Sequence, residues 1–321
     1  MTAVLAAEIS AGGPIPFRRF METALYHPGH GYSRRASDPF GKDGDFFTAE
    51  QLQPVFGRLM AALAGSLRDK MGGAPEFSLV ELGAGRMEMA PAFSAFNYIP
   101  VEKERGEMPE RFTGVVFANE FFDALPVDLL AARGGTWREM LVGWREDRFH
   151  WVEGDEAAPR QLEYARRYLP APEEGTLLEV NLDALEWLER VASRLERGWV
   201  IAIDYGYTAR ELIRFPEGTL MSYRRHTALE DVLSEPGGRD ITAHVNFTAL
   251  MDRAVELGFA HTRLERLVQT LMTVGEKDQF ASALSAGSDA ERTRLTLQLK
   301  TLLFGMGETF RTLLLGKNVR Q

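Results

Sequence analysis

The most constraining feature of this chain is an apolar run that ends in two closely spaced glycines, Leu79-Val80-Glu81-Leu82-Gly83-Ala84-Gly85-Arg86. The apolar part is typical of a buried strand, which we predict over 77–82. Gly83 and Gly85 permit a sharp turn and a close approach of the backbone to a ligand. A short helix is expected over 87–96, with its amide groups directed back at the turn. This strand–turn–helix pattern indicates an α/β fold that binds its ligand at the turn.

The next predicted strand, over 98–102, ends in Glu102. A carboxylate at this position suits the two hydroxyl groups of a ribose. The turn lacks the third glycine of a dinucleotide-binding motif, because position 88 is Glu88, and the acidic Glu81 lies just before the turn. An acidic turn suits a cationic ligand better than a pyrophosphate. S-adenosylmethionine, which carries a sulfonium and an α-ammonium group, therefore fits the pattern better than NAD does.

Two further apolar runs continue the alternation of strands and helices. Residues 115–118 predict a buried strand that leads into Asn119-Glu120-Phe121-Phe122-Asp123, and 199–206 is the clearest buried strand of the chain. Such alternation predicts a parallel sheet with the ligand site at the carboxyl ends of its strands. The glycine turn, Glu102 and residues 119–123 all fall at such ends. We therefore expect an α/β, Rossmann-like core.

The core is flanked by segments of a different character. An antiparallel insertion is expected at about 127–175, residues 215–246 are rich in loops, and a strand is expected over 310–315. Helices are predicted over 1–13, 16–26, 50–70, 182–197, 247–257, 276–287 and 289–303. The expected division is an N-terminal helical or lid segment (1–75), the core with its insertion (76–210), and a part that supplies substrate-cleft loops and completes the core (211–321).

Composition excludes several classes of function. The 321 residues carry a formal net charge of −9, which argues against nonspecific binding to nucleic acid or to an anionic membrane. The chain has no cysteine, and no His, Asp and Glu cluster has metal-binding spacing. There is no apolar run of about 18 residues, so no membrane span is expected. The N-terminus lacks the pattern of a signal peptide. We expect a cytoplasmic protein without a metal.

Several stretches occur together in an order that resembles one known family. They are Gly13-Pro14-Ile15-Pro16-Phe17, Tyr26-His27-Pro28, Gly31-Tyr32, Gly44-Asp45-Phe46-Phe47-Thr48, Glu81-Leu82-Gly83-Ala84-Gly85-Arg86, Asn119-Glu120-Phe121-Phe122-Asp123-Ala124-Leu125-Pro126, Ile203-Asp204-Tyr205-Gly206 and Asp240-Ile241-Thr242-Ala243-His244-Val245. Over nearly the whole chain they resemble the MidA family of S-adenosylmethionine-dependent methyltransferases. Mitochondrial members of that family assist the assembly of respiratory complex I.

This resemblance implies a class I (Rossmann-like) methyltransferase core with an N-terminal helical segment and an antiparallel β insertion. It implies S-adenosyl-L-methionine as the cofactor and an arginine-containing protein as the substrate. The oligomeric state stays open, with a homodimer as one option. The chain departs from the family pattern after Gly85, where Met87 replaces a glycine and the stretch up to Ala118 is short.

Two other functions stay open at this point. One is methylation of a small molecule, which a narrow apolar cleft would favour, whereas an open acidic groove would favour a protein arginine. The other is a non-catalytic assembly factor that binds a partner protein, which the departure after Gly85 suggests. In that case the side chains of Met87, Met89 or Phe93 are expected to fill the cofactor pocket.

The candidate cofactor-binding residues are Glu81, Gly83, Gly85, Glu102 and Asp45. Glu102 is expected at the ribose hydroxyls, and the two glycines are expected beside the methionine part. Glu81 either holds the α-ammonium group, directly or through water, or serves as a helix-dipole or salt-bridge partner. Asp45 either closes over the cofactor or caps its own loop.

The candidate catalytic residues are Glu120, Asp123 and Asn119, where a methyltransferase of this class presents its substrate. The pKa of a guanidinium lies above about 12. Nearby carboxylates would therefore orient it, localise its charge and accept the proton lost during transfer. Glu120 suits that role, with an ion pair to an arginine as the structural alternative. Asp123 fits two roles equally well: the same catalytic role, or capping of the turn before Pro126.

Other polar and aromatic residues near these stretches are assigned mainly to structure. His244, Asp240 and Asn246 would line the substrate mouth if they were functional, but a lone histidine in a loop is more often structural. Asp204 is either a turn former or a residue of the same cleft. The aromatic pairs Phe46-Phe47 and Phe121-Phe122 are more often part of the hydrophobic core than adenine-stacking groups.

Overall fold

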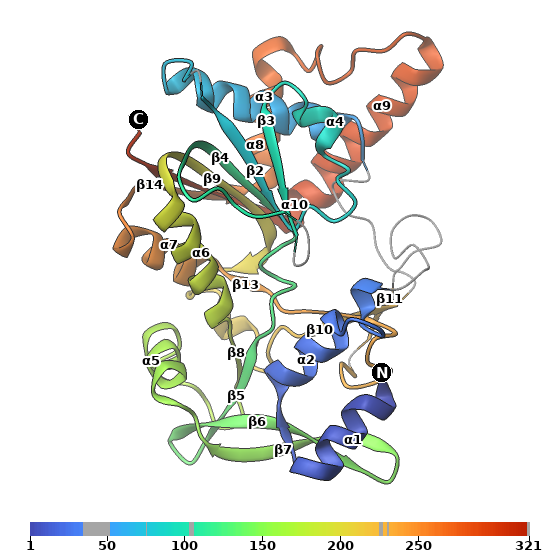
Figure 1. The fold of residues 1–321 in the computed structure, drawn as a ribbon, viewed down its shortest axis with the longest axis vertical. Helices are drawn as coiled ribbons and strands as arrows, with labels where there is room; N and C mark the ends of the chain where they lie inside the picture. The colour runs from blue at the N-terminus through green and yellow to red at the C-terminus, as the bar shows by residue number, and fades with distance from the viewer. Residues whose placement is uncertain (35–51, 75, 103–105, 225–226, 230, 320–321) are drawn as a thin grey trace. The chain divides into compact units, whose positions relative to one another are not determined.

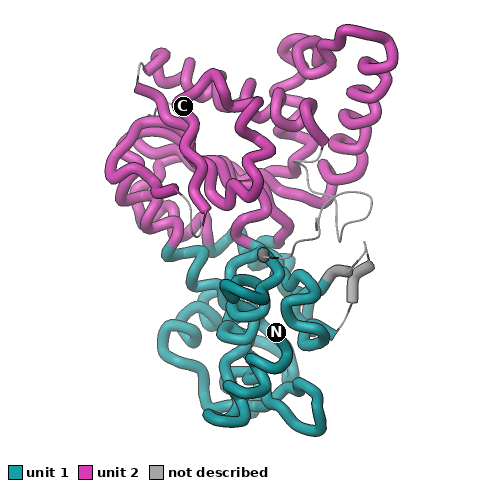
Figure 2. Tube along the Cα trace, turned by 45° about the vertical axis from the view of Figure 1, so that its right-hand side comes forward, with its two compact units in different colours: residues 1–47, 123–186, 207–249 teal, residues 48–122, 187–206, 250–321 magenta. Residues whose placement is uncertain are grey.

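The computed structural model describes the chain except for residues 35–51, 75, 103–105, 225–226, 230 and 320–321 (Figure 1). The chain forms two compact units, each assembled from three separate segments (Figure 2). The parallel-sheet unit contains 48–122, 187–206 and 250–321, and the antiparallel unit contains 1–47, 123–186 and 207–249. The division expected from the sequence follows chain order, whereas these units combine segments that are distant along the chain.

A mixed sheet forms the centre of the parallel-sheet unit, with the strand order β14-β15-β9-β4-β2-β3. Four strands are parallel, namely β2 (Ser78–Leu82), β3 (Asn97–Val101), β4 (Phe112–Asn119) and β9 (Leu195–Tyr207). β15 (Phe310–Lys317) runs antiparallel between β9 and β14 (Phe259–Arg266). The expected parallel sheet is therefore present, and its strands lie where the apolar runs predict them.

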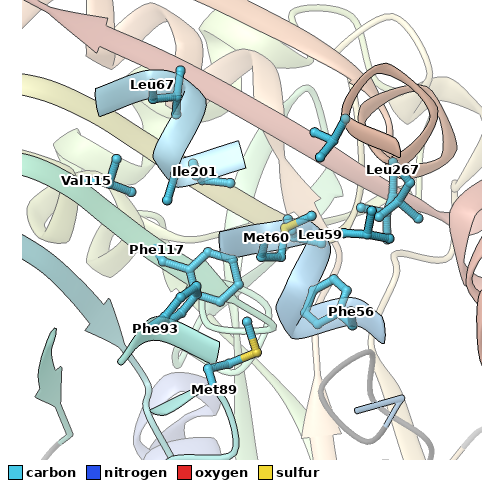
Figure 3. Packing of buried hydrophobic residues seen from close by; sticks show 14 of the residues in the cluster. Phe56, Leu59, Met60, Leu67, Met89, Phe93, Val115, Phe117, Ile201 and Leu267 are labelled. Atoms are coloured by element: carbon cyan, nitrogen blue, oxygen red, sulfur yellow. The ribbon is translucent and has the colours of Figure 1, made fainter. Parts of the chain in front are cut away.

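One face of this sheet packs on helices through a single hydrophobic cluster (Figure 3). Phe117 of β4 and Ile201 of β9 share this cluster with Phe56 and Met60 of α3 and with Leu267 of α8. The helices that contribute to it are α3 (Val55–Lys70), α4 (Ala90–Phe93), α8 (Leu267–Gly275) and α9 (Asp289–Thr301). Because β2 and β4 are buried along most of their length, their sequences are mostly apolar instead of alternating.

The antiparallel unit is built on a second sheet, with the strand order β1-β6-β5-β8 and with β7 paired to β6. Its strands are β1 (Ile15–Pro16), β5 (Asp128–Arg133), β6 (Thr136–Arg145), β7 (Arg148–Glu156) and β8 (Leu177–Val180). Its helices are α1 (Thr2–Gly12), α2 (Phe17–Tyr26) and α5 (Pro159–Tyr168). A turn at Gly134-Gly135 joins β5 to β6. Because β1 pairs with β6, the N-terminal segment and the insertion form one unit.

The remaining elements are short or carry the chain between units. A three-stranded sheet contains β10 (Met221–Arg224), β11 (Thr227–Leu229) and β12 (Asp240–Thr242), inside the region expected to be mostly loop. β13 (Val245–Asn246) leads into α7 (Phe247–Glu256), and α6 (Leu182–Arg194) leads into β9. A π-helical turn (Leu302–Met306) and α10 (Gly307–Thr309) precede β15, and 3-10 turns occupy Tyr32–Arg34, Leu212–Arg214 and Glu276–Asp278.

Two helix predictions in the parallel-sheet unit were wrong. The helix expected over 276–287 is only the 3-10 turn Glu276–Asp278, and the helix α8 precedes it. Gln279 and Phe280 both have positive φ angles, which ends any helix there, and Phe280 packs against the hydrophobic cluster. The helix expected over 87–96 is reduced to α4, because Met87 also has a positive φ of 63°.

Candidate active site

The strand register places three predicted residues at one edge of the parallel sheet. Leu82, the last residue of β2, lies opposite Val101 of β3 and Ala118 of β4. The residues that follow them, Gly83, Glu102 and Asn119, therefore lie at the same level along the carboxyl edge. This is the edge at which open α/β sheets bind their ligands.

The glycine turn has the backbone conformation that the sequence predicts. Gly83 has a φ of 68° and Gly85 a φ of 47°, both in the left-handed region that favours glycine. The amide of Gly83 donates to the Val101 carbonyl at 2.9 Å. A Cβ atom at Gly83 would lie 2.9 Å from Cδ2 of Phe121, so a side chain at this position meets an aromatic ring.

Glu102 connects the end of β3 to this turn. Its Oε2 accepts a hydrogen bond from the Gly85 amide at 3.0 Å, and the side chain is half-buried. A carboxylate can accept several hydrogen bonds at once, so this contact leaves Glu102 able to accept from further donors. The carboxylate is therefore fixed beside the turn, as the sequence predicts.

Glu81 is a buried acid directly below the turn. It is 1% exposed, and its Oε2 accepts a hydrogen bond from the Tyr98 hydroxyl of β3. No described residue bonds its Oε1. Burial raises the pKa of Glu81 to about 7. The negative charges of Glu88 and Glu102 raise this pKa further, whereas the hydrogen bond from Tyr98 lowers it. Among the described residues, the only partner recorded for the Glu81 carboxylate is the Tyr98 hydroxyl.

Glu81 should make the stability of the protein depend on pH. A raised pKa means that the folded chain binds this proton more tightly than the unfolded chain does. The resulting stabilisation is complete below pH 4.5 and is lost as the pH rises through about 7. Relative to Glu81→Gln, the free energy of unfolding of the parent should fall by about 3 kcal/mol between these limits. Urea unfolding of both proteins across this range measures the difference, and parallel pH profiles would rule out the effect.

Asn119 and Glu120 form a polar pair at the end of β4. The Asn119 side-chain amide donates to Glu120 Oε1 at 3.2 Å, and the Glu120 amide donates to the Ile203 carbonyl of β9 at 2.9 Å. Asn119 is buried, and its Oδ1 has no partner among the described residues. Glu120 has a φ of 49°, a left-handed conformation that is strained for a residue with a side chain.

Asp204 of β9 holds the backbone that follows this pair. It is fully buried, and its Oδ2 accepts from the Phe122 amide at 2.9 Å. Its Oδ1 accepts from the Tyr205 amide at 3.1 Å. Asp204 therefore fixes the turn that carries Glu120 and Phe121.

Several predicted residues lie elsewhere. Asp45 falls outside the described residues. Asp123 belongs to the antiparallel unit, where its carbonyl accepts from the Ala243 amide at 3.1 Å. In the same unit, the His244 ring meets the Phe215 ring edge-on, burial lowers its pKa, and its amide bonds the Thr219 hydroxyl. Asn246 accepts from the Ala249 amide at the start of α7. These contacts support structural roles for His244 and Asn246.

Of the three side chains that would fill the site in a non-catalytic protein, one is exposed and two are buried in the hydrophobic core. Met87 is 37% exposed. Met89 and Phe93 are fully buried in the cluster beneath the sheet, where Phe93 contacts Phe117 (Figure 3). Their burial is explained by core packing.

A family of S-adenosyl-L-methionine-dependent methyltransferases matches residues 92–264 of the chain. The chain belongs to this family. It is similar to the mitochondrial protein arginine methyltransferase NDUFAF7 homolog of Drosophila melanogaster, at 29% identity over 80% of this chain and 70% of that protein. It is also similar to mitochondrial protein arginine methyltransferase NDUFAF7 of Homo sapiens, at 26% identity over 77% of this chain and 67% of that protein.

The solved structures agree with this family assignment. A COG1565 superfamily protein from Burkholderia thailandensis, bound to S-adenosyl-homocysteine, has a TM-score of 0.87 and 29% identity, covering 100% of this chain and 92% of that chain. A native structure from the same organism has a TM-score of 0.81 and 28% identity with the same coverage. The chain is thus a class I methyltransferase with a Rossmann-like core, as the sequence predicts.

The residues of the site fit the family's cofactor, S-adenosyl-L-methionine. The cofactor carries an ammonium group and a sulfonium. The edge contains the carboxylate of Glu102 and, buried beside it, Glu81 Oε1, which has no partner among the described residues. Gly85 and Arg86 are exposed. Acidic, acceptor-rich surroundings suit a cationic ligand.

The sequence indicates no role at this edge for Tyr98 or Phe121. Tyr98 bonds Glu81 across the β2–β3 pair, and only the strand register reveals that contact. Phe121 was assigned to the core with Phe122, but only Phe122 is buried, whereas Phe121 is partly exposed. Among the described residues there is no group of three or more potential metal ligands. None of the described helices is long and apolar enough to cross a membrane.

Proposed function

We propose that this methyltransferase transfers its methyl group to an arginine side chain of a protein. The observation that carries the proposal is the Asn119–Glu120 pair, in which a buried Asn119 Oδ1 without a partner among the described residues lies beside the Glu120 carboxylate. A guanidinium offers only N–H donors and a positive charge, so it suits a set of acceptor atoms. The names of the curated relatives, which are protein arginine methyltransferases, support the same acceptor.

The carboxyl edge of the sheet is assigned to the cofactor. Glu102 would bind the ribose hydroxyls, Gly83 and Gly85 would pass beside the methionine part, and Glu81 would accept from the α-ammonium group through its Oε1. When bound, S-adenosyl-L-methionine supplies an electrophilic methyl group on its sulfonium. Asp45 as a cofactor contact stays a prediction from the sequence.

Glu120 is assigned the role of base at the acceptor. Its carboxylate would accept an N–H of the guanidinium and hold the neighbouring nitrogen in line for transfer. When that nitrogen gains the methyl group it loses a proton, and Glu120 is the carboxylate that would take the proton. Asn119 would accept a second N–H and keep the guanidinium from rotating. Asp123 stays a predicted acceptor contact on the basis of its sequence position.

Calorimetric titration of S-adenosylmethionine and S-adenosylhomocysteine tests the cofactor assignment. The parent is expected to bind both, and Glu102→Ala should weaken binding by about tenfold or more, because the ribose hydroxyls lose a charged acceptor. Glu107→Ala, at an exposed carboxylate near the end of β3, is the matched control and should bind like the parent. If the parent binds neither compound at millimolar concentration, the assignment fails.

Arginine methylation is then tested with tritiated cofactor and peptide libraries that differ only by Arg→Lys replacement. Label that depends on arginine supports the proposed acceptor. The proposal is contradicted if tritium is transferred only to small molecules. It is also contradicted if a protein that binds the cofactor labels no peptide.

The proposed location is the cytoplasm. It rests on the lack of cysteine, which suits a reducing compartment. The curated relatives named above are mitochondrial proteins. Fractionation of cells that produce the tagged protein distinguishes the two locations.

A further inference from the structure

The Phe121 side chain lies against the glycine turn that follows β2. The atoms nearest to the position of a Cβ at Gly83 all belong to Phe121, namely Cδ2 at 2.9 Å and Cβ and Cγ at 3.7 Å. The side chain is partly exposed, in contrast to its buried neighbour Phe122. The absence of a side chain at Gly83 is therefore what allows the ring of Phe121 to lie against the turn.

The Phe121 ring is held in place from two other sides. It meets the Phe122 ring edge-on, with centroids 5.2 Å apart and an interplanar angle of 77°. It meets the Trp187 ring at 5.3 Å and 85°. The backbone on either side is also fixed, because the Glu120 amide bonds the Ile203 carbonyl and the Phe122 amide bonds Asp204. The ring is thus preorganised before any ligand binds.

The surroundings of the ring are electronegative. Glu81 and Glu102 flank the same turn, and Glu120 precedes Phe121 in the chain. An aromatic face carries a negative quadrupole that attracts a cation, most strongly where water is displaced. A cation at the turn would therefore be attracted by the ring as well as by the carboxylates.

We propose that the Phe121 ring is a binding residue for the sulfonium of S-adenosylmethionine and lets the site distinguish this cation from its neutral product. The proposal rests on the cofactor assignment above. S-adenosylmethionine and S-adenosylhomocysteine have the same carboxylate, ammonium and adenosine groups and differ by the methyl group and its positive charge. A ring that recognises the charge favours the first compound and releases the second more easily after transfer.

The ratio of the two dissociation constants, measured by calorimetry, tests the proposal. Phe121→Leu keeps an apolar side chain but removes the aromatic quadrupole. It should weaken the binding of S-adenosylmethionine by about fivefold or more. It should weaken the binding of S-adenosylhomocysteine by less than about threefold. Phe121→Tyr keeps the ring and should keep the ratio. Phe122→Leu, at the buried neighbour, is the matched control and should lower the melting temperature without changing the ratio.

A graded series separates charge recognition from shape. Replacement of Phe121 by fluorinated phenylalanines with increasing fluorine content weakens the quadrupole with little change in ring size. The affinity for S-adenosylmethionine should fall stepwise along the series while the affinity for S-adenosylhomocysteine stays constant. Equal losses for both compounds, or no loss for either, would overturn the proposal and leave the cofactor assignment intact. A parent that binds neither compound would overturn both.

Discussion

Gly83→Val should weaken the binding of S-adenosylhomocysteine by about 100-fold or more while the protein still folds. Gly83 has a left-handed backbone that a β-branched residue adopts only with strain of about 1–2 kcal/mol. In addition, its new side chain would meet the Phe121 ring, which Phe122 and Trp187 hold in place. The turn or the ring must therefore move away from its position in the parent, and an affinity loss of about 100-fold corresponds to about 2.8 kcal/mol.

Gly72→Val separates the two effects. Gly72 has a φ of 80°, similar to that of Gly83, but no atom lies within 4 Å of the position of its Cβ. It should therefore suffer the same backbone strain and still bind the cofactor like the parent. Calorimetry gives the affinities, and urea unfolding gives the stabilities. Cofactor binding by Gly83→Val within a few-fold of the parent would show that the turn does not contact the ligand.

Glu120→Gln should lower the turnover of an arginine acceptor by about 100-fold or more, the usual contribution of a positioned base. Glutamine preserves the shape and can still pair with the Asn119 amide, but it cannot take a proton. The affinity for S-adenosylhomocysteine should stay within about twofold of the parent, because Glu120 is assigned to the acceptor and not to the cofactor. Single-turnover rates with an arginine peptide, alongside calorimetry, measure both quantities.

Glu88→Gln provides the control for this prediction. Glu88 is a half-buried acid close to the same turn, and it has no proposed role in proton transfer. It should retain most of the turnover. If Glu120→Gln turns over like the parent, Glu120 has only a structural role, and its strained backbone needs another explanation.

The strained backbone at Glu120 illustrates how the fold supports the site. The left-handed φ persists because neighbouring contacts determine it from both sides, through the Ile203 carbonyl before the turn and the Asp204 carboxylate after it. Both partners lie on β9, the neighbouring parallel strand. The Asn119–Glu120 pair is therefore positioned by a rigid strand. Sites built on strands hold their side chains more precisely than sites built on loops do.

The parallel core could be read from the sequence because its signals are local. The apolar runs of β2, β4 and β9 and the glycines after β2 each show their role within a few residues. In parallel sheets the carboxyl ends of the strands lie at one edge, so the proximity of Gly83, Glu102 and Asn119 followed from strand order alone. The helix expected over 276–287 failed because Gln279 and Phe280 have positive φ angles, which the local apolar pattern does not show, and Phe280 packs against the hydrophobic cluster.

The sequence by itself determined the strand and the glycine turn that follows it, the acidic residues at that edge and the family to which the chain belongs. Only the tertiary structure decided which side chains meet there. It joined Tyr98 to Glu81, placed Phe121 against Gly83 and made Asp204 the anchor of the Glu120 turn. It also combined the N-terminal helices with the insertion through the pairing of β1 with β6. Local patterns report backbone preference and burial, whereas these contacts depend on strand register and side-chain packing between segments far apart in the chain.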